Sequence, residues 1–533
     1  MYRNEFIMRK KSKTKIFIII FLIIAVLYPL IEMLVRVEWS DFSKLVTSHN
    51  FIESLTNSLF VTTIATIISI AIAYVLAFTL NRTNIKHRAV LKVLLTLPML
   101  IPSISHGLGL INLFGVNGII SKALSFNIIG SIGIIMGSII YSFPVAFLML
   151  DDGFNYIDNS MYDAAKTLGL NKWQTFKKVT LCYLKKPIIS ATFAVFTMIF
   201  TDYGVPLAVG GKFLTLPVFL YKEVIGLLDF SRGTIIGLFL LVPAFISFLF
   251  DNFTKDHTNT SNNKGYIIPK NKLRDILLTT FTYLVLIFIV VLIGSFVYYA
   301  FINNYTLDRS FSLTHFEYVF DNEIGTYIFN SLIISIMVAI VGTIVAYFAA
   351  YTTARVKGKT ARIVHILTIL SLAVPGIVLG LSYSIGFKNS FIYNTFIILI
   401  LVNIVHFIAT PYLMAYNALQ KVNQNFEAVA ESCSIPKFKL IKDVIVPCTK
   451  KTIREMIAYF FVNSMITISA IAFLFNVGTM PLSLLINNYE GTMMLGEAAI
   501  VSLIILTFNI IVKGIVYMIN RKEFMRSEEN GAN

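Results

Sequence analysis

The 533-residue chain is 56% hydrophobic and only 14% charged, with a mean hydropathy of +0.77. A soluble fold of this size could not bury so much apolar surface, so we expect a lipid bilayer to be its solvent. Lys and Arg outnumber Asp and Glu by 44 to 28. These charges lie in short loops between apolar runs, so the basic balance does not indicate a nucleic-acid partner.

Twelve apolar runs are each long enough to cross about 30 Å of hydrocarbon. The first six cover 16–35, 54–80, 89–114, 128–150, 188–208 and 233–251, and the second six cover 276–302, 326–352, 362–386, 391–416, 452–475 and 494–519. We therefore predict an all-α polytopic membrane protein built from two tandem six-helix bundles. The expected segments are a first half 1–251, a linker 252–274, a second half 275–520 and a polar C-terminal tail 521–533.

The distribution of basic residues predicts an orientation in the membrane. The first run follows a cluster of Lys and Arg but is long and has no clear small-x-small cleavage site, so we expect a retained anchor in the cell membrane. The positive-inside rule then places the N-terminus in the cytoplasm. Basic loops at 82–92, 166–186 and 355–362 and the polar linker would share that side, and the acidic loop 303–325 would be external.

The two halves contain an internal repeat. Identities at one constant offset pair Asn57-Ser58-Leu59 with Asn330-Ser331-Leu332, Ala73-Tyr74 with Ala346-Tyr347, Arg82 with Arg355, Pro102 with Pro375, and Gly107-Leu108 with Gly380-Leu381. Equivalent spans lie an even number apart, so the repeats share one orientation and a pseudo-twofold axis along the membrane normal. Pro102 and Pro375 are expected to kink the third span of each half.

A long basic loop follows the fourth span of each half, at 160–187 and 425–450. Each loop predicts two short helices joined by a turn. In the first, Ser160 is expected to cap a helix together with Asp163, and Gly169 is expected to stop it in the left-handed conformation.

The second helix of the first loop has apolar residues at helical spacing, namely Trp173, Phe176 and Val179. In the second loop, Glu427 supplies the first-turn carboxylate and Pro436 is expected to help start the next helix.

Both loops resemble the EAA loop of binding-protein-dependent ABC permeases, in which an acid, paired alanines and a glycine precede hydrophobic positions and a proline. By this resemblance the coupling residues are Asp163, Ala164, Ala165, Gly169 and Trp173 in the first loop and Glu427, Ala428, Ala430 and Ser434 in the second. Ser434 stands where the family has glycine, so the second turn departs from the pattern. The alternative is an amphipathic basic loop that lies on anionic lipid.

The resemblance implies a MetI-like permease that couples to separate proteins. The expected partners are an ABC ATPase in two copies, an extracellular or periplasmic solute-binding protein, and membrane lipid. Gly358-Lys359-Thr360 lacks the upstream glycine and the preceding strand of a phosphate loop. We therefore expect no catalytic residue and no cofactor in this chain, with ATP and Mg²⁺ bound by the partner ATPase.

Polar groups within spans are candidates for a translocation pathway. Asp202 and Tyr203 lie near the outer end of the fifth span and Glu497 begins the last one; Pro102 and Pro375 would act through shape. A helix cap, an interhelical hydrogen bond or an interfacial position are the alternatives for the two carboxylates. His106, His365, His406 and the three cysteines lack ligand spacing, so no metal site is predicted.

The substrate expected from the resemblance is 2-aminoethylphosphonate. This rests on the segments Asp202–Pro206, Leu214–Pro217 and Gly226–Phe230, and ferric iron is the alternative. A proton-coupled secondary carrier of the major facilitator type would also have two parallel halves, but its acidic-basic Gly-rich loop is missing at 81–88. No clustered His, Asp, Glu, Ser or Lys constellation indicates a membrane enzyme.

Overall fold

The computed structural model describes residues 16–531, except 117, 121–127, 156, 254–267, 270, 305–307, 356–357 and 424. Most of the expected linker, the basic residues before the first run and Lys357 therefore lie outside the described residues.

The first half consists of a span and the elements that follow it in order. A helix over Ile16–Val35 includes the π-helical turn η1 (Ile23–Leu27) and α2 (Tyr28–Val35). It is followed by α3 (Trp39–Val46), α4 (His49–Arg82), α5 (Arg88–Leu95), η2 (Leu97–Leu100), α6 (Ser103–Phe114), α8 (Ser131–Asn155), α9 (Asn159–Thr167), α10 (Lys172–Thr175), η3 (Phe176–Thr180), α11 (Leu181–Phe200), α12 (Gly204–Val209), α13 (Leu216–Tyr221), η4 (Lys222–Gly226) and α14 (Phe230–Phe253).

The second half repeats most of this order, with a hairpin added and no counterpart of α12 or η4. It consists of α15 (Lys272–Ala300), β1 (Ile302–Asn304), β2 (Asp308–Phe311), α16 (Thr314–Asp321), α17 (Ile324–Arg355), α18 (Lys359–Leu370), η5 (Ser371–Ala373), α19 (Gly376–Gly386), α20 (Phe396–Phe407), α21 (Ala409–Lys421), α22 (Asn425–Ser432), α23 (Lys437–Leu440), η6 (Ile441–Ile445), α24 (Val446–Cys448), α25 (Lys450–Ile466), α26 (Leu482–Gly491) and α27 (Leu495–Gly531). The two strands form an antiparallel hairpin, a small exception to the all-α architecture.

The irregular elements recur as well as the regular ones. Each half has a short helix before its second span (α3 and α16), a 3₁₀ turn within its third (η2 and η5), and a π-helical turn after its fourth (η3 and η6). Such deviations are rare enough that their recurrence in register supports a duplicated unit.

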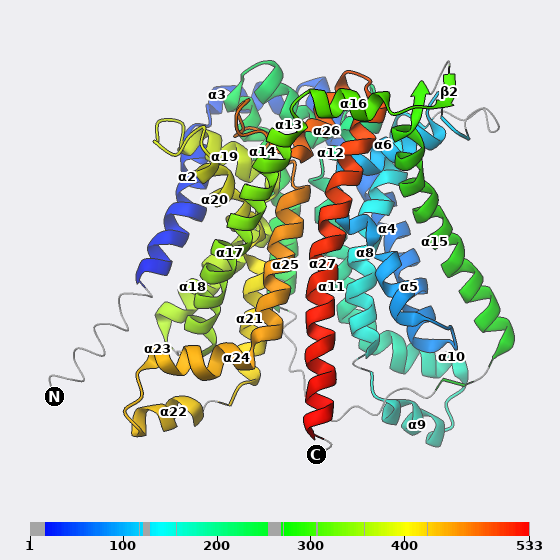
Figure 1. Cartoon of the computed structure of the whole chain (residues 1–533), viewed down its shortest axis with the longest axis vertical. Helices are drawn as coiled ribbons and strands as arrows, with labels where there is room; N and C mark the ends of the chain where they lie inside the picture. Colours follow the sequence, from blue (N-terminus) through cyan, green and yellow to red (C-terminus); the bar gives the residue numbers. More distant parts are fainter. Residues whose placement is uncertain are drawn as a thin grey trace.

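The first span of each half packs against the opposite half. The hydroxyl of Tyr28 on α2 donates to the carbonyl of Gly386 at 3.0 Å, and the hydroxyl of Tyr299 on α15 donates to the carbonyl of Asn112 at 3.2 Å. Figure 1 shows α2 beside α19 on one side and α15 on the other. This exchange binds the halves into one unit.

The predicted spans correspond to helices, although not all are continuous. Among the described residues, eight helices are long and apolar enough to cross a membrane by length and composition, and two bent pairs raise the number to 10. The pairs are α18–η5 with α19, bent by 110°, and α20 with α21, bent by 54°. The remaining two predicted spans correspond to α5–η2–α6, which is interrupted, and to α25, which has 17 residues.

The prolines predicted to kink the third spans break them. Pro102 and Pro375 are the residues directly before α6 and α19, and each follows a 3₁₀ turn and an extended residue. Proline lacks the amide hydrogen that would continue the preceding helix but suits the position just before a new one, so a break results.

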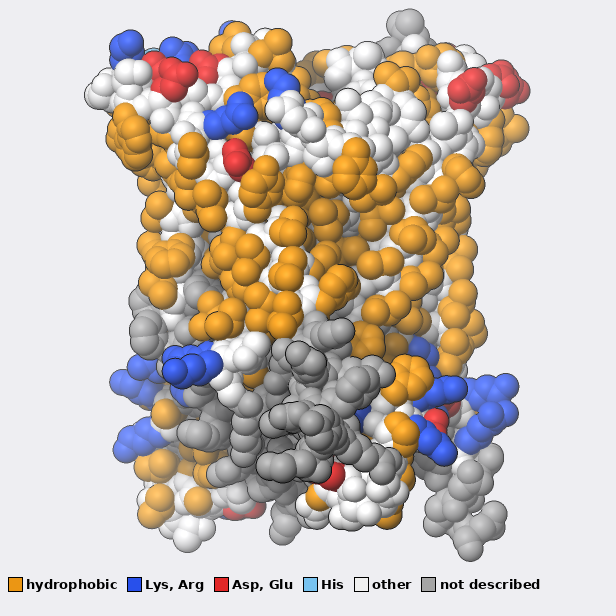
Figure 2. All heavy atoms as spheres, turned by 90° about the vertical axis from the view of Figure 1, so that its left-hand side faces the viewer, with side chains coloured by type: hydrophobic (Ala, Val, Ile, Leu, Met, Phe, Trp, Pro, Cys, Tyr) orange, Lys and Arg blue, Asp and Glu red, His pale blue; other side chains and the backbone are white. Residues whose placement is uncertain are grey.

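The outer face of the helices is apolar. Figure 2 shows hydrophobic side chains over the middle of one face, with charged side chains near both ends. The exposed apolar residues include Ile67 on α4, Leu284 on α15, Ile340 on α17 and Ile510 on α27. In water this surface would be unfavourable, so the belt is consistent with a multi-pass membrane protein.

Candidate functional site

Two equivalent helical loops lie together at one end of the molecule. We call α9–α10 with η3 the first coupling loop and α22–α23 with η6 the second. Figure 1 shows both at the lower end, on either side of the C-terminal part of α27. In each loop a short helix ends in a turn and a second one continues into the fifth span of that half.

The turn between the two short helices has the same conformation in both loops. Gly169 has φ +69° and Ser434 has φ +58°. The left-handed turn predicted for Gly169 is confirmed, and the second loop makes it with a serine. A left-handed conformation disfavours residues with a Cβ atom, so the sequence alone left this turn open.

The cap predicted for α9 is wrong. Asp158, not Ser160, precedes the helix, and its carboxylate accepts a hydrogen bond from the Ser160 amide at 2.9 Å. Asp163 instead accepts from the side-chain amide of Asn159 at 2.9 Å. Aspartate caps well because its carboxylate also faces the positive end of the helix dipole, and it lies two residues earlier than the motif suggested.

The second short helix begins differently in the two loops. The α10 helix starts with a capping box between Asn171 and Gln174. Pro436 directly precedes α23, as the sequence predicts.

Exposed apolar side chains cover both coupling loops. Leu168 is 78% exposed, Trp173 71% and Phe438 74%. Trp173 stacks on Phe176, with ring centroids 5.6 Å apart. Val179, on the same predicted apolar face, is buried and belongs to the interior. Large apolar groups in water at adjacent turns are typical of a surface that binds another protein.

The alanines of the motif divide between two environments. Ala165 and Ala430 are buried, whereas Ala164 and Ala428 are exposed. One small residue per loop therefore lets the short helix approach its own half closely, and the other leaves the outer face shallow.

The two loops are anchored by different polar contacts. On the second half, the Arg355 guanidinium at the end of α17 binds both carboxylate oxygens of Glu427 at 2.6 Å. It also donates to the backbone carbonyls of Leu419, Val422 and Asn423. This side chain is only 1% exposed.

On the first half, the equivalent Arg82 lies 5.4 Å from the ring centroid of Phe154 and 5.5 Å from that of Tyr162, and donates to the Phe154 carbonyl. Asp151, at the same end of α8, binds Lys92 and Asn81. Both arginines, predicted only as positive-inside charge, are thus structural anchors of the loops.

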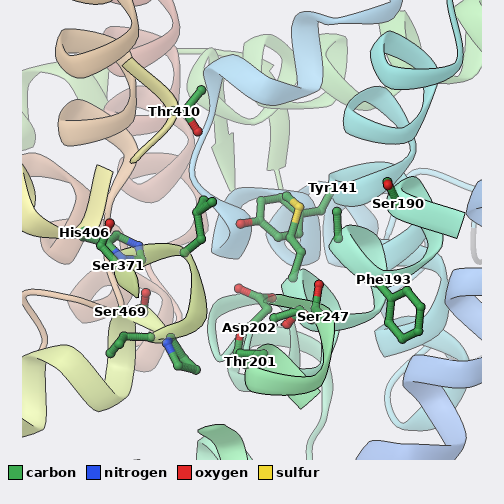
Figure 3. Close-up of a pocket in the computed structure, with 18 of the residues that line it drawn as sticks. Tyr141, Ser190, Phe193, Thr201, Asp202, Ser247, Ser371, His406, Thr410 and Ser469 are labelled. Carbon is green, nitrogen blue, oxygen red and sulfur yellow. Dashed lines mark hydrogen bonds between the residues drawn. The ribbon is translucent and has the colours of Figure 1, made fainter. Parts of the chain in front are cut away.

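A cavity of about 450 Å³ lies between the halves. Its polar lining includes Tyr141, Thr201 and Asp202 from the first half and Ser371, His406 and Ser469 from the second. Figure 3 shows these two groups on opposite sides of the cavity. Pro375 and Gly376 also line it, because the break before α19 exposes this segment.

Asp202 lines the cavity and also caps α12. Its carboxylate accepts hydrogen bonds from the amides of Gly204 at 3.3 Å and Val205 at 3.0 Å. The pathway position and the local cap, weighed as alternatives from the sequence, are therefore compatible.

The other predicted pathway residues lie elsewhere. Tyr203 is 1% exposed and stacks near Tyr221, with centroids 5.1 Å apart. Pro102 is not among the residues that line the cavity. Glu497, at the start of α27, binds the imidazole of His315 on α16 at 2.9 Å. Sequence reasoning missed Tyr141 and set His406 aside for lack of ligand spacing, since a single aromatic or histidine within a span has no spacing signal.

Comparisons with known proteins match both halves. The family described as the binding-protein-dependent transport system inner membrane component matches residues 65–255 and 342–524. A Haemophilus influenzae protein named as a ferric transport system permease protein is 26% identical over 491 residues, which cover 87% of this chain and 77% of that protein.

Two further relatives show how the match extends. The ferric transport system permease protein FbpB of Actinobacillus pleuropneumoniae is 26% identical over 447 residues, 80% of this chain and 65% of that protein, just under two thirds of its length. The sulfate transport system permease protein CysT of Escherichia coli is 24% identical over 203 residues, 37% of this chain and 73% of that protein.

Proposed function

Because the chain belongs to the family of binding-protein-dependent transport system inner membrane components, we propose that it forms the whole translocation pathway of an ATP-driven importer. The observation that carries this proposal is the pair of coupling loops at one end, each with exposed apolar side chains at the same place in its repeat. In this proposal the lower end of Figure 1 faces the cytoplasm, and each loop binds one copy of a separate ABC ATPase.

The geometry suggests how the partners act on the pathway. When ATP binding draws the ATPase subunits together, the coupling loops move with them. Each loop is continuous through η3 or η6 with the fifth span of its half, and that span leads to the segment that lines the cavity. Moving the loops would therefore rock the halves and open the cavity alternately to the two sides. The binding protein delivers solute at the opposite end.

We propose ferric ion as the solute, in place of the 2-aminoethylphosphonate expected from the sequence. Two relatives that align over most of the chain are named for ferric transport. The lining of the cavity agrees, because it includes a carboxylate and neither Lys nor Arg among the described residues. A phosphonate anion would favour cationic or amide donors.

Reconstitution tests the proposal. The permease, its ATPase and the binding protein encoded beside it are placed in proteoliposomes, and ATP hydrolysis and solute uptake are measured together. We expect ferric-loaded binding protein to stimulate both activities and 2-aminoethylphosphonate to stimulate neither. Stimulation by 2-aminoethylphosphonate and not by ferric ion would support the phosphonate as the solute. Uptake without any ATPase would indicate a secondary carrier.

A further inference from the structure

The cavity between the halves combines three side chains that suit a hard metal cation. Asp202 contributes a carboxylate, Tyr141 a phenol and His406 an imidazole. Carboxylate oxygen, phenolate oxygen and imidazole nitrogen all occur as ligands of iron in proteins. No group of three or more His, Cys, Asp or Glu gathers at a metal-binding distance in the described parts of the chain. We therefore treat the three side chains as successive weak contacts for a passing cation and not as a resident metal site.

The imidazole of His406, on α20, lies at the wall of the cavity. Its Nδ1 atom is buried and has no hydrogen-bond partner among the described residues. Burying a polar atom without a partner is unfavourable, so a rotation that turns this nitrogen toward the cavity would be favoured when a ligand or a water there can pair with it.

The neighbouring glycine makes room for this imidazole. A Cβ atom built on Gly376 would lie 3.0 Å from Nε2 of His406 and 2.5 Å from Oγ of Ser469. The break at Pro375 thus places Gly376, which has no side chain, against the imidazole ring. This leaves room for His406 beside the cavity.

Asp202 is placed by its cap. Two amides at the start of α12 hold its carboxylate, and the residue is only 9% exposed. A carboxylate has about four lone-pair sites, and the side chain of Ser103 binds a third, so one remains. The first half therefore presents a fixed carboxylate and the second an imidazole at the wall of the same cavity.

We propose that Asp202, Tyr141 and His406 form a transit site for a hard cation, with ferric ion as the cargo. This inference rests on the proposed function and adds the residues that the cargo meets within the membrane. Weak, successive contacts suit conduction, because a cargo bound too tightly would not leave. The two halves contribute different groups, so the repeat is symmetric in fold and asymmetric in its pathway.

The substitution Asp202→Asn removes the charge and keeps one of the two oxygens that accept from the first amides of α12. His406→Gln removes the imidazole, and His49→Gln, on an exposed residue at the start of α4, is the matched control. We expect D202N and H406Q to keep ATPase stimulation by ferric-loaded binding protein while iron uptake falls roughly tenfold or more, as expected when a charge-assisted contact is lost. H49Q keeps both.

Direct binding gives a second readout. Ferric citrate added to the permease in nanodiscs should produce the visible absorption of a phenolate bound to iron, and Tyr141→Phe should abolish it. Uptake at the wild-type level in both D202N and H406Q, with no such absorption in the wild type, would overturn the transit site. Failure of ferric-loaded binding protein to stimulate the wild-type complex would instead overturn the proposed substrate.

Discussion

Arg355 and Glu427 join the end of a transmembrane helix to a coupling loop by two parallel hydrogen bonds of 2.6 Å each. The guanidinium is almost completely buried and the carboxylate is 30% exposed. Bidentate pairs of this kind fix orientation as well as distance. The acidic residue of the second EAA-like motif is therefore bound within its own chain, where it holds α22 against α17.

We expect Glu427→Gln to loosen the second coupling loop. The substitution removes the opposite charge and one of the two oxygens that bind the buried Arg355, which should destabilise the loop by about 2 kcal/mol. Hydrogen exchange of residues 425–432 should accelerate, and ATPase stimulation should fall. Glu431→Gln, an exposed residue of the same helix, should change neither measurement. Unchanged exchange in E427Q would show that the ion pair does not hold the loop.

The two left-handed turns predict opposite responses to substitution. Gly169→Ala introduces a Cβ atom at φ +69° and should destabilise the first loop by about 1 kcal/mol, whereas Ser434→Gly should stabilise the second by a similar amount. Local exchange rates in the two loops measure both effects. A stabilising G169A would mean that this turn is not left-handed in the assembled protein.

Trp173 is predicted to contribute strongly to ATPase binding. Exposed aromatic residues often dominate the affinity of an interface, so Trp173→Ala should weaken binding by at least about tenfold. Binding of the purified ATPase to the permease in nanodiscs measures this change. Trp39→Ala, on a residue that is 72% exposed on α3, is the matched control and should bind as the wild type does. Equal losses in both variants would point to a general defect in folding.

The repeat predicts equal effects of two serine substitutions. Ser58 accepts a hydrogen bond from the amide of Leu216, and Ser331 accepts one from the amide of Leu482, both at 2.7 Å. Replacing either by alanine leaves a buried amide unsatisfied, so each should lower stability by roughly 1–3 kcal/mol. Thermal unfolding in detergent compares the variants. A large effect in only one half would argue against equivalent roles.

The His315–Glu497 contact predicts a pH dependence of α16. The hydrogen bond to the Glu497 carboxylate raises the pKa of His315 above its usual range. Its stabilisation is therefore fully present below the unfolded pKa of about 6.5 and is lost as pH rises through the higher folded value. Exchange of Thr314–Asp321, corrected for the intrinsic rate, should accelerate over that rise. In Glu497→Gln this dependence should flatten; an unchanged profile would contradict the assignment.

A membrane constrains several sequence features strongly, and these features were enough to predict the fold. Apolar length predicted helices for all twelve spans, and the paired Asn, Ser, Pro and Gly identities predicted the repeat. The structure gives two of these identities a physical reason. The side-chain amide of Asn57 donates to the carbonyl of Leu214, and that of Asn330 donates to the carbonyls of Gly478 and Met480. Polar residues with specific partners inside a membrane protein have few acceptable replacements.

Tertiary contacts explain what the sequence could not predict. Arg355 reads as a loop charge until the end of α17 meets the first turn of α22. His406 reads as an isolated histidine until the break at Pro375 brings Gly376 against it. Asp158 and not Ser160 caps α9, because this helix begins at Asn159, earlier than the motif suggests. In the first two cases the decisive partner is distant in the sequence, and in the third it lies just before the motif.

Both coupling loops are proposed to bind a separate ATPase, and site-specific crosslinking tests this binding most directly. Cysteines are introduced one at a time at Ala164 and Ala428 after the exposed Cys182, Cys433 and Cys448 are replaced by serine. We predict that each new cysteine crosslinks to the ATPase, and that ATP changes the yield at both positions. Crosslinks to lipid only, or none at either position in an active complex, would contradict the account.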